Sequence, residues 1–390
     1  MSMKKIHIPL LPRIIIAIAL GVLLGKFMPE SIVRIFATFN DIFGQFLGFL
    51  IPLIIIGLVT PAIAEIGKGA GKLLMATAAL AYFDTVLAGL LTYGTGRALF
   101  PDLIESAAGL EAVSKPESLQ PYFSIQIPAA IDVMGALVLS FILGICIAQG
   151  GAPTMKKFFA EFRDIISLVI AKTIVPLLPL YIFGIFLSMT MSGQVWHILS
   201  VFAMIIVVIF ALHIFVLLYE FAAAGLLTHR NPLRLLARMM PAYFTALGTA
   251  SSAATIPVTL KQTKENGVSD EIAAFTIPLC STIHMSGSTL KITACALTIC
   301  MIQNMPYDFP LFLNFILMLG ICMVAAPGVP GGSIMAALAP LSSILGFGAE
   351  AQALMIDLYI AMDSFGTACN VTGDGAIALI VDKSFRKKEA

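Results

Sequence analysis

Six consecutive apolar stretches, each long enough to cross a bilayer as a helix, dominate the N-terminal part of this chain. Of the 390 residues, 59% are hydrophobic and only 12% are charged, and the mean hydropathy is +0.98. Soluble domains carry about 25% charged residues, so a soluble protein is excluded and an all-α polytopic membrane protein is predicted. A net charge of +1 gives no indication of a nucleic-acid partner. The stretches are 10–28, 40–63, 73–98, 128–149, 163–190 and 195–227.

Two later apolar stretches, 233–265 and 308–346, are each interrupted in the middle by small residues. Each half is too short to cross a bilayer, which predicts a re-entrant helical hairpin whose tip lies at membrane depth. A full span follows each hairpin, over 270–303 and 350–381, and this repetition predicts inverted repeats with a binding site near the midplane. The alternative for either break alone is a Gly/Pro kink in an ordinary helix. The resulting fold has eight transmembrane helices plus two re-entrant hairpins.

Basic residues concentrate in alternate loops, whereas the loop 101–122 carries four carboxylates and a single lysine. Because positive charge favours the cytoplasmic side, we expect both termini in the cytoplasm of a cell whose inner or plasma membrane holds this multi-pass protein. No nucleotide-binding loop is found in the sequence, so ATP-driven transport by this chain alone is not expected. The N-terminal segment lacks a small-residue cleavage site and is interpreted as the first span.

A polar stripe lies within the last apolar segment. Asp363, Thr367, Asn370 and Asp374 follow one another at offsets 0, +4, +7 and +11, which places them on one face of a helix. Ionisable residues inside a membrane are costly and usually line a substrate or ion pathway. The alternative is a polar seam that joins helices.

Enzymatic activity and an organic cofactor are not expected, because no nucleophile–base pair or metal-binding pattern stands out. The six cysteines lie in apolar stretches without C-x-x-C spacing and are interpreted as small core residues. His7, His197, His213 and His229 are scattered, and Glu220, Asp132 and Asp357 are assigned no role.

Four motifs stand out in the C-terminal half of the chain: Ser251-Ser-Ala-Ala-Thr-Ile-Pro257, the seventh-span run Pro278 to Leu290, Gly328-Val-Pro-Gly331 and Asn370-Val-Thr-Gly-Asp374. Together they resemble the motifs of the dicarboxylate/amino-acid:cation symporters. The resemblance implies a homotrimer in which a transport domain moves across the membrane like an elevator. It places the scaffold in 1–70 and 126–192, the third helix of the transport domain in 71–100, an external loop in 101–125 and the transport-domain core in 193–390.

The resemblance also implies a substrate site at the hairpin tips. In members of this family, the residue that matches Asp363 binds the α-amino group of the substrate. Asn370 is then placed to donate to the α-carboxylate. Half-helix ends at the tips supply N–H groups that suit an anion. The implied substrate-binding residues are Ser251, Ser252, Ser288, Val329, Asp363, Gly366, Thr367 and Asn370.

The sequence departs from the acidic-substrate pattern, in which an arginine stands at the position of Gly366 or of Ala250. A buried substrate γ-carboxylate without a cationic partner is unfavourable. We therefore expect a symporter of a neutral amino acid, with space at Gly366 for its side chain. One alternative is that the substrate is another small carboxylate or dicarboxylate. An alternative from a different functional class is a channel or a sensor on the same scaffold.

The cation sites differ as well. The family's Asn-Met-Asp-Gly-Thr motif is His284-Met-Ser286-Gly-Ser288 here, and Val86 follows the matching Tyr82 and Thr85. One sodium site therefore lacks its ligands, whereas a second Na+ site is implied at Asp374, Asn370 and Cys280. A third implied Na+ site is built from backbone carbonyls around Thr282 and Met285.

Lys291 and Asp84 are two further charges in apolar surroundings. We expect them to pair, with the lysine ammonium standing in for a missing mobile cation. His284 is a candidate carrier of a coupling proton, because histidine titrates near neutrality in water. Coupling to either Na+ or H+ is thus open, and the alternative is a static ion pair beside a core histidine.

Overall fold

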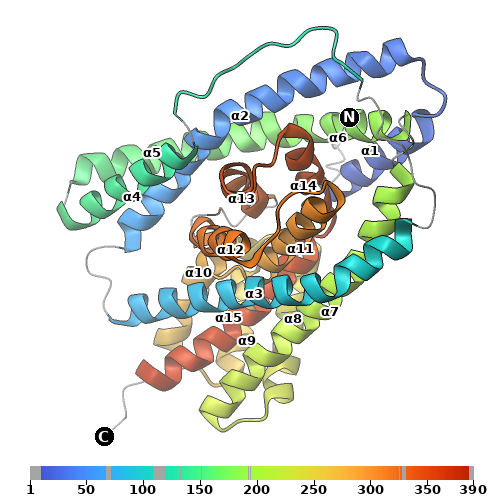
Figure 1. Ribbon diagram of the computed structural model, residues 1–390. Coiled ribbons are helices and arrows are strands. Elements are labelled where there is room, and N and C mark those ends of the chain that lie inside the picture. The colour runs from blue at the N-terminus through green and yellow to red at the C-terminus, as the bar shows by residue number, and fades with distance from the viewer. Residues whose placement is uncertain are drawn as a thin grey trace, which may run out of the picture.

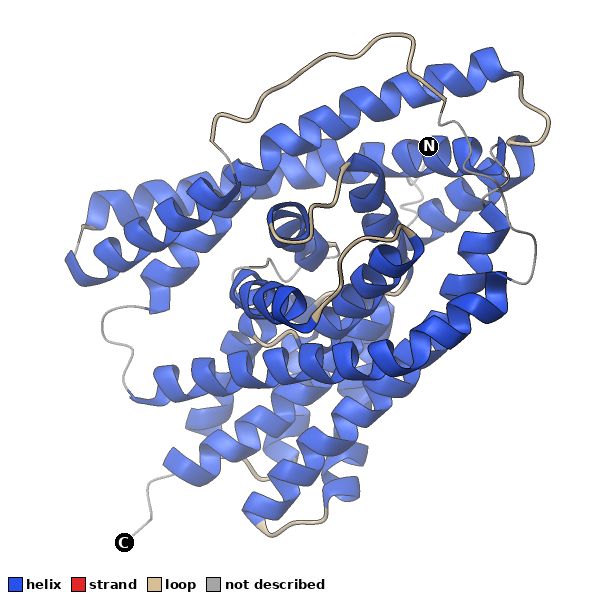
Figure 2. Cartoon of the chain, viewed as in Figure 1, coloured by secondary structure: helices blue, strands red, loops and turns tan. Residues whose placement is uncertain are grey.

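The computed structural model describes residues 10–66, 72–108, 119–131, 133–150, 152–191, 193, 195–324, 326 and 331–385, and every regular element in these ranges is helical (Figures 1 and 2). Val329, a predicted substrate contact, lies outside the described residues. The helices are α1 (Leu10–Leu24), α2 (Glu30–Ile66), α3 (Lys72–Ala108), α4 (Val133–Gly150), α5 (Pro153–Val169), η1 (Ile170–Ile174), α6 (Val175–Met191), α7 (Val195–Thr228), α8 (Pro232–Thr249), α9 (Ser252–Glu265), α10 (Asp270–Ile283), α11 (Ser286–Ile302), α12 (Phe309–Val324), α13 (Gly332–Ser343), α14 (Ala349–Ala361) and α15 (Asp363–Phe385).

Four segments of the described chain are long and apolar enough to cross a membrane. They are Glu30–Pro61, Lys72–Glu105, Leu199–Thr228 and Asp270–Ile302, and a fifth arises if the helices on either side of a 47° bend, Pro153–Ile174 and Pro176–Met191, form one span. These helices confirm a polytopic membrane protein. The predicted count of eight spans stays a prediction, because other apolar helices are shorter and α14 and α15 are separated at Met362.

The helices pack in two groups that face each other (Figure 1). In one group α1 packs on α6, and α2 packs on α4, α5 and α6. In the other, α15 packs on α7, α8, α9, α10 and α11, and α3 packs on α7 and α11. Both α13 and α14 also contact α2, so these two helices lie between the groups.

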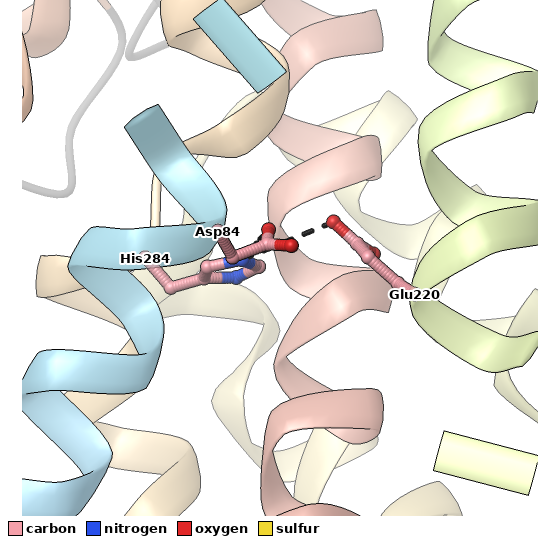
Figure 3. Close-up of side chains that lie close together, drawn as sticks. All are labelled: Asp84, Glu220 and His284. Carbon is pink, nitrogen blue, oxygen red and sulfur yellow. Dashed lines mark hydrogen bonds and ion pairs between the residues drawn. The ribbon is translucent and has the colours of Figure 1, made fainter. Parts of the chain in front are cut away.

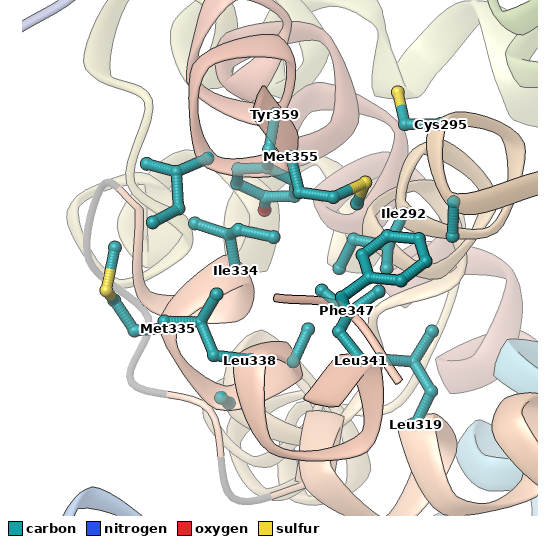
Figure 4. Packing of buried hydrophobic residues seen from close by; sticks show 14 of the residues in the cluster. Ile292, Cys295, Leu319, Ile334, Met335, Leu338, Leu341, Phe347, Met355 and Tyr359 are labelled. Carbon is teal, nitrogen blue, oxygen red and sulfur yellow. The ribbon is translucent and has the colours of Figure 1, made fainter. Parts of the chain in front are cut away.

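Both predicted hairpins are present as pairs of short helices that pack on each other. α8 ends at Ala250, whose φ of 49° reverses the chain, and Ser251 then caps α9 by accepting a hydrogen bond from the Ala254 amide at 3.3 Å. α12 and α13 form the second hairpin, in which Gly331 has a φ of 76° at the start of α13. Apolar side chains from α11, α12, α13 and α14 fill the space between this hairpin and the rest of the molecule (Figure 4).

The seventh predicted span is two helices, α10 and α11, interrupted at His284 and Met285. His284 is extended, with φ −101° and ψ 108°. In the last turn of α10 the hydroxyls of Ser281 and Thr282 bond to carbonyls three residues earlier, a local bond that competes with helix propagation. The break puts the His284 side chain and the first amides of α11 at the centre of the helical group.

Candidate functional site

Two groups of buried ionisable side chains lie around the break between α10 and α11. The first, named here the His284 cluster, consists of His284, Asp84 on α3, Glu220 on α7 and Asp374 on α15. The second, the Lys291 pair, consists of Lys291 on α11 and Asp363 at the start of α15. All six side chains are at least nine-tenths buried.

The imidazole ring of His284 lies between two carboxylates. Its Nδ1 is 3.0 Å from Asp374 Oδ1, and its Nε2 is 2.9 Å from Asp84 Oδ2. Figure 3 shows the ring beside Asp84, with the Glu220 carboxyl approaching from α7; Glu220 Oε1 is 3.9 Å from Nε2. Carboxyl groups from three helices, α3, α7 and α15, therefore surround the one ring.

These contacts require bound protons. An ionised carboxylate only accepts hydrogen bonds, and a neutral imidazole has one N–H, so both ring contacts are satisfied only if the ring or a carboxyl carries an additional proton. A hydrogen bond also joins the side chains of Asp84 and Glu220, and two carboxyls can bond only through a shared proton (Figure 3). The contacts of the His284 cluster thus need more protons than a neutral imidazole among ionised carboxylates would carry.

Further side chains hold the carboxylates in place. Tyr219 donates to Asp84 Oδ1 at 2.7 Å, and Ser286 donates to Glu220 Oε1 at 3.0 Å. Glu220 Oε2 is buried and has no hydrogen-bond partner among the described residues. It lies where a Cβ at position 373 would project, so only a glycine there leaves room for it. The cluster therefore retains one buried oxygen with unused acceptor capacity.

The Lys291 ammonium is fully buried and has three partners. Nζ lies 3.6 Å from Asp363 Oδ1, donates to the Met362 carbonyl at 3.2 Å and stands 3.7 Å from the centre of the Tyr359 ring. Asp363 Oδ2 accepts a hydrogen bond from the Gly331 amide at 2.8 Å. Because Asp363 is in the first turn of α15, the helix dipole also favours its negative charge.

The expected pairing of Lys291 with Asp84 is wrong. Lys291 pairs with Asp363, whereas Asp84 belongs to the His284 cluster. The predicted space at Gly366 is also wrong, because a Cβ there would overlap the Lys291 side chain. Seven residues separate His284 from Lys291, but the unwound backbone directs them to different carboxylates.

Asn370 connects α15 to the start of α11. Its Oδ1 accepts hydrogen bonds from the amides of Gly287 at 2.8 Å and Ser288 at 3.2 Å, which are unpaired first-turn donors of α11. Its Nδ2 donates to Ser288 Oγ at 3.0 Å and lies 3.3 Å from Met285 Sδ. In this arrangement the amide that was expected to bind a substrate carboxylate caps a helix.

The other predicted substrate residues lie on the same elements. Ser251 and Ser252 form the tip and first turn of α9, Ser288 shares a 3.1 Å hydrogen bond with the Tyr359 hydroxyl, and Thr367 is buried on α15. The stripe predicted for the last span is therefore one buried face of α15, although its role in binding stays a prediction.

The predicted cation residues are more dispersed. Thr85 accepts from the Met285 amide at 3.2 Å, and the Cys280 carbonyl accepts from the His284 amide. Tyr82 instead donates to the Leu317 carbonyl on α12 at 3.1 Å, and the exposed Thr282 bonds within α10. The predicted sodium ligand Asp374 is engaged by His284.

One ligand atom from each of Asp84, Glu220 and His284 lies within 4.8 Å of the others. An imidazole with two carboxylates suits a transition metal better than Na+, which as a hard cation prefers oxygen ligands. Since the ring nitrogens already face carboxylates, a positive ion entering here would replace protons. The arrangement can therefore exchange positive charge.

Sequence reasoning missed Glu220, Tyr219, Tyr359 and His213. Glu220 is a carboxylate within a spanning stretch, a signal that marks a functional candidate. The buried His213 ring lies 3.1 Å from the Gly287 carbonyl, and this contact helps to hold the start of α11. The tyrosines left no signal, because tyrosine is common in apolar segments.

A model of one protein family matches residues 10–384, nearly the whole chain. Its description is the sodium:dicarboxylate symporter family. The match covers both hairpins, the break between α10 and α11, and both groups of buried charges. The chain therefore belongs to the sodium:dicarboxylate symporter family and is a cation-coupled symporter of the dicarboxylate and amino-acid class.

Proposed function

We propose that this symporter moves a small carboxylate-bearing solute together with protons, which bind at the His284 cluster. One observation carries the proposal: both nitrogens of a fully buried histidine ring face carboxylates from α3 and α15. Such a ring requires a proton that the cluster can release when its surroundings change.

The alternative coupling ion is Na+, and the side chains favour it less. Na+ prefers oxygen ligands, and an imidazole occupies the centre of this cluster. The carboxylate expected from the family motif is replaced by Ser286, which donates its hydroxyl hydrogen to Glu220. A proton needs none of the oxygen cage that a sodium ion requires.

The transport movement is proposed from packing. α1, α2, α4, α5 and α6 pack mainly among themselves, and both charge groups lie in α3, α7, α10, α11 and α15. We propose that the second set moves as a transport domain against the first, in an elevator movement, within a homotrimer. Mass measurement of the detergent-solubilised protein tests the trimer.

The sequence favours a neutral amino acid as the solute, because no arginine stands at Gly366 or Ala250. A carboxylate without an amino group is the second candidate, and the pairing of Lys291 with Asp363 favours it. Both candidates share the carboxylate, for which α13 offers the backbone donors of its N-terminal turn.

Proton coupling is tested in liposomes that contain the purified protein. An acidic exterior without a Na+ gradient should drive accumulation of labelled solute, whereas a Na+ gradient at constant pH should drive little. His284→Asn should abolish the pH-driven accumulation while leaving exchange of internal for external solute measurable.

His229→Asn is the matched control, since His229 is exposed, has a φ of 56° that asparagine tolerates, and lies outside the cluster. Accumulation that rises with a Na+ gradient alone and is unaffected by His284→Asn would contradict proton coupling. Absence of both uptake and exchange for every carboxylate would contradict the symporter itself.

A further inference from the structure

The starting observation is that Asp363 is already neutralised by the chain itself. Oδ1 faces the Lys291 ammonium at 3.6 Å, and Oδ2 accepts the Gly331 amide at 2.8 Å. Both oxygens have partners, and the side chain is 8% exposed. A substrate ammonium could reach Asp363 only by displacing Lys291.

Displacement of Lys291 is unfavourable because, among the described residues, Asp363 is the carboxylate with which it forms an ion pair. The remaining contacts are the Met362 carbonyl at 3.2 Å and the Tyr359 ring at 3.7 Å. Neither neutralises a full positive charge, and an ammonium left without its counter-ion inside a protein is strongly destabilising. Two ammonium groups beside one carboxylate would also repel each other.

The absence of a side chain at Gly366 makes room for the Lys291 side chain. A Cβ at Gly366 would overlap Cε and Nζ of Lys291, so the glycine provides the volume that the lysine fills. Tyr359 covers the ammonium from α14, and its hydroxyl is fixed by Ser288 at 3.1 Å. Residues from α11, α14 and α15 thus hold the ammonium over the aspartate.

We propose that Lys291 is a specificity-determining residue that reserves Asp363 and excludes substrates with an α-ammonium. The site then takes short mono- or dicarboxylates that lack an amino group, and it rejects the amino acids of the same carbon skeleton. This inference rests on the proposed function. Rejection by an uncompensated charge is a means by which a binding site discriminates between close analogues.

The experiment uses the full-length protein in nanodiscs and in liposomes, with three pairs of compounds. Each pair has one carbon skeleton with and without the amino group: succinate and aspartate, propionate and alanine, and 3-hydroxypropionate and serine as the hydroxylated pair. Binding is measured by competition against the best-bound compound. The wild type should prefer the amino-free member of the bound pair by at least about tenfold in Kd.

Lys291→Met keeps the length of the side chain and removes the charge. It should move the preference by at least about tenfold toward the amino acid, because Asp363 is released to bind an ammonium. Lys291→Met combined with Asp363→Asn should bind both members of a pair alike. Thr293→Val is the matched control: it is isosteric, buried on the same helix, and loses no hydrogen bond that the described residues make.

A wild-type preference for the amino acid of any bound pair would overturn the inference and leave the symporter intact. An unchanged preference in folded Lys291→Met would overturn it as well. If Lys291→Met does not fold, the wild-type preference decides alone. If no member of any pair binds or exchanges, the proposed function fails together with the inference.

Discussion

The His284 cluster and the Lys291 pair are both buried, both use one residue of α15, and differ in charge balance. The cluster has three carboxyl groups around one imidazole, so it needs additional positive charge to be neutral. The pair has one ammonium and one carboxylate and is neutral by itself. The first arrangement can take up positive ions, whereas the second can only exchange partners.

The difference shows that one helix, α15, contributes a carboxylate to each of two groups that differ in charge balance. Asp363 and Asp374 lie on the same buried face of α15, eleven residues apart, which corresponds to about 16 Å along the helix axis. Asn370 lies between them and caps α11.

The largest effect on stability is expected when one carboxylate is removed from each group and the two variants are compared. Asp84→Ala leaves the His284 ring, the Tyr219 hydroxyl and Glu220 without a shared partner, and should destabilise the protein by about 3–5 kcal/mol. Asp363→Ala removes the counter-ion of the buried Lys291 and should also destabilise the protein, but by less, because one side chain rather than three loses its partner. Thermal unfolding in detergent measures both.

Asp270→Ala serves as the control for both variants. Its carboxylate is 84% exposed and pairs with Lys264 at the surface, so its loss should cost less than about 1 kcal/mol. If Asp363→Ala were the more destabilising of the two buried variants, the contrast between the groups would be reversed.

A medium effect is expected at two glycines of α15. A methyl at Gly373 would displace Glu220 and His284, and a methyl at Gly366 would displace Lys291. Overpacking of this kind costs about 1–3 kcal/mol. Gly373→Ala should reduce uptake driven by a pH gradient with little change in substrate Kd, whereas Gly366→Ala should weaken substrate binding.

Gly375→Ala on the same helix is the matched control, because its methyl would meet the flexible end of Met239. Identical uptake and binding defects in Gly373→Ala and Gly366→Ala would show that the two groups act as one site.

The smallest effect is expected at a buried carboxyl that belongs to neither the His284 cluster nor the Lys291 pair. Asp357 on α14 is 1% exposed, and neither of its oxygens has a hydrogen-bond partner among the described residues. If it has no transport role, Asp357→Leu should raise stability by about 1 kcal/mol, because an unsatisfied polar group is removed. Unfolding temperature and uptake rate are measured together. A loss of uptake in the stabilised variant would add Asp357 to the functional groups.

The sequence was sufficient for much of the fold. Apolar length and two interruptions by small residues predicted helices and hairpins, and α8 with α9 and α12 with α13 form such pairs. The stripe from Asp363 to Asp374 was found by helical periodicity and is buried on α15. These features are local, so the chain itself reveals them.

The partners of the buried charges could not be found in the same way. Pairing Lys291 with Asp84 assumed that the nearest unexplained charges meet, but the backbone break at His284 changes which direction each side chain takes. Glu220 is 64 residues before His284 in sequence and meets it only after folding. Contacts between distant helices depend on tertiary packing, which periodicity does not report.

The break between α10 and α11 has an evolutionary consequence. In an unbroken helix, positions 284 and 291 would share a face, since seven residues turn the helix by about 700°. Substitutions that alter one would then disturb the other. Residues 284 and 285 are both unwound, so on the roles proposed above a substitution at 291 changes the accepted solute while the ring at 284 keeps its contacts. On these proposed roles, the interruption lets the accepted solute and the coupling ion vary independently of each other.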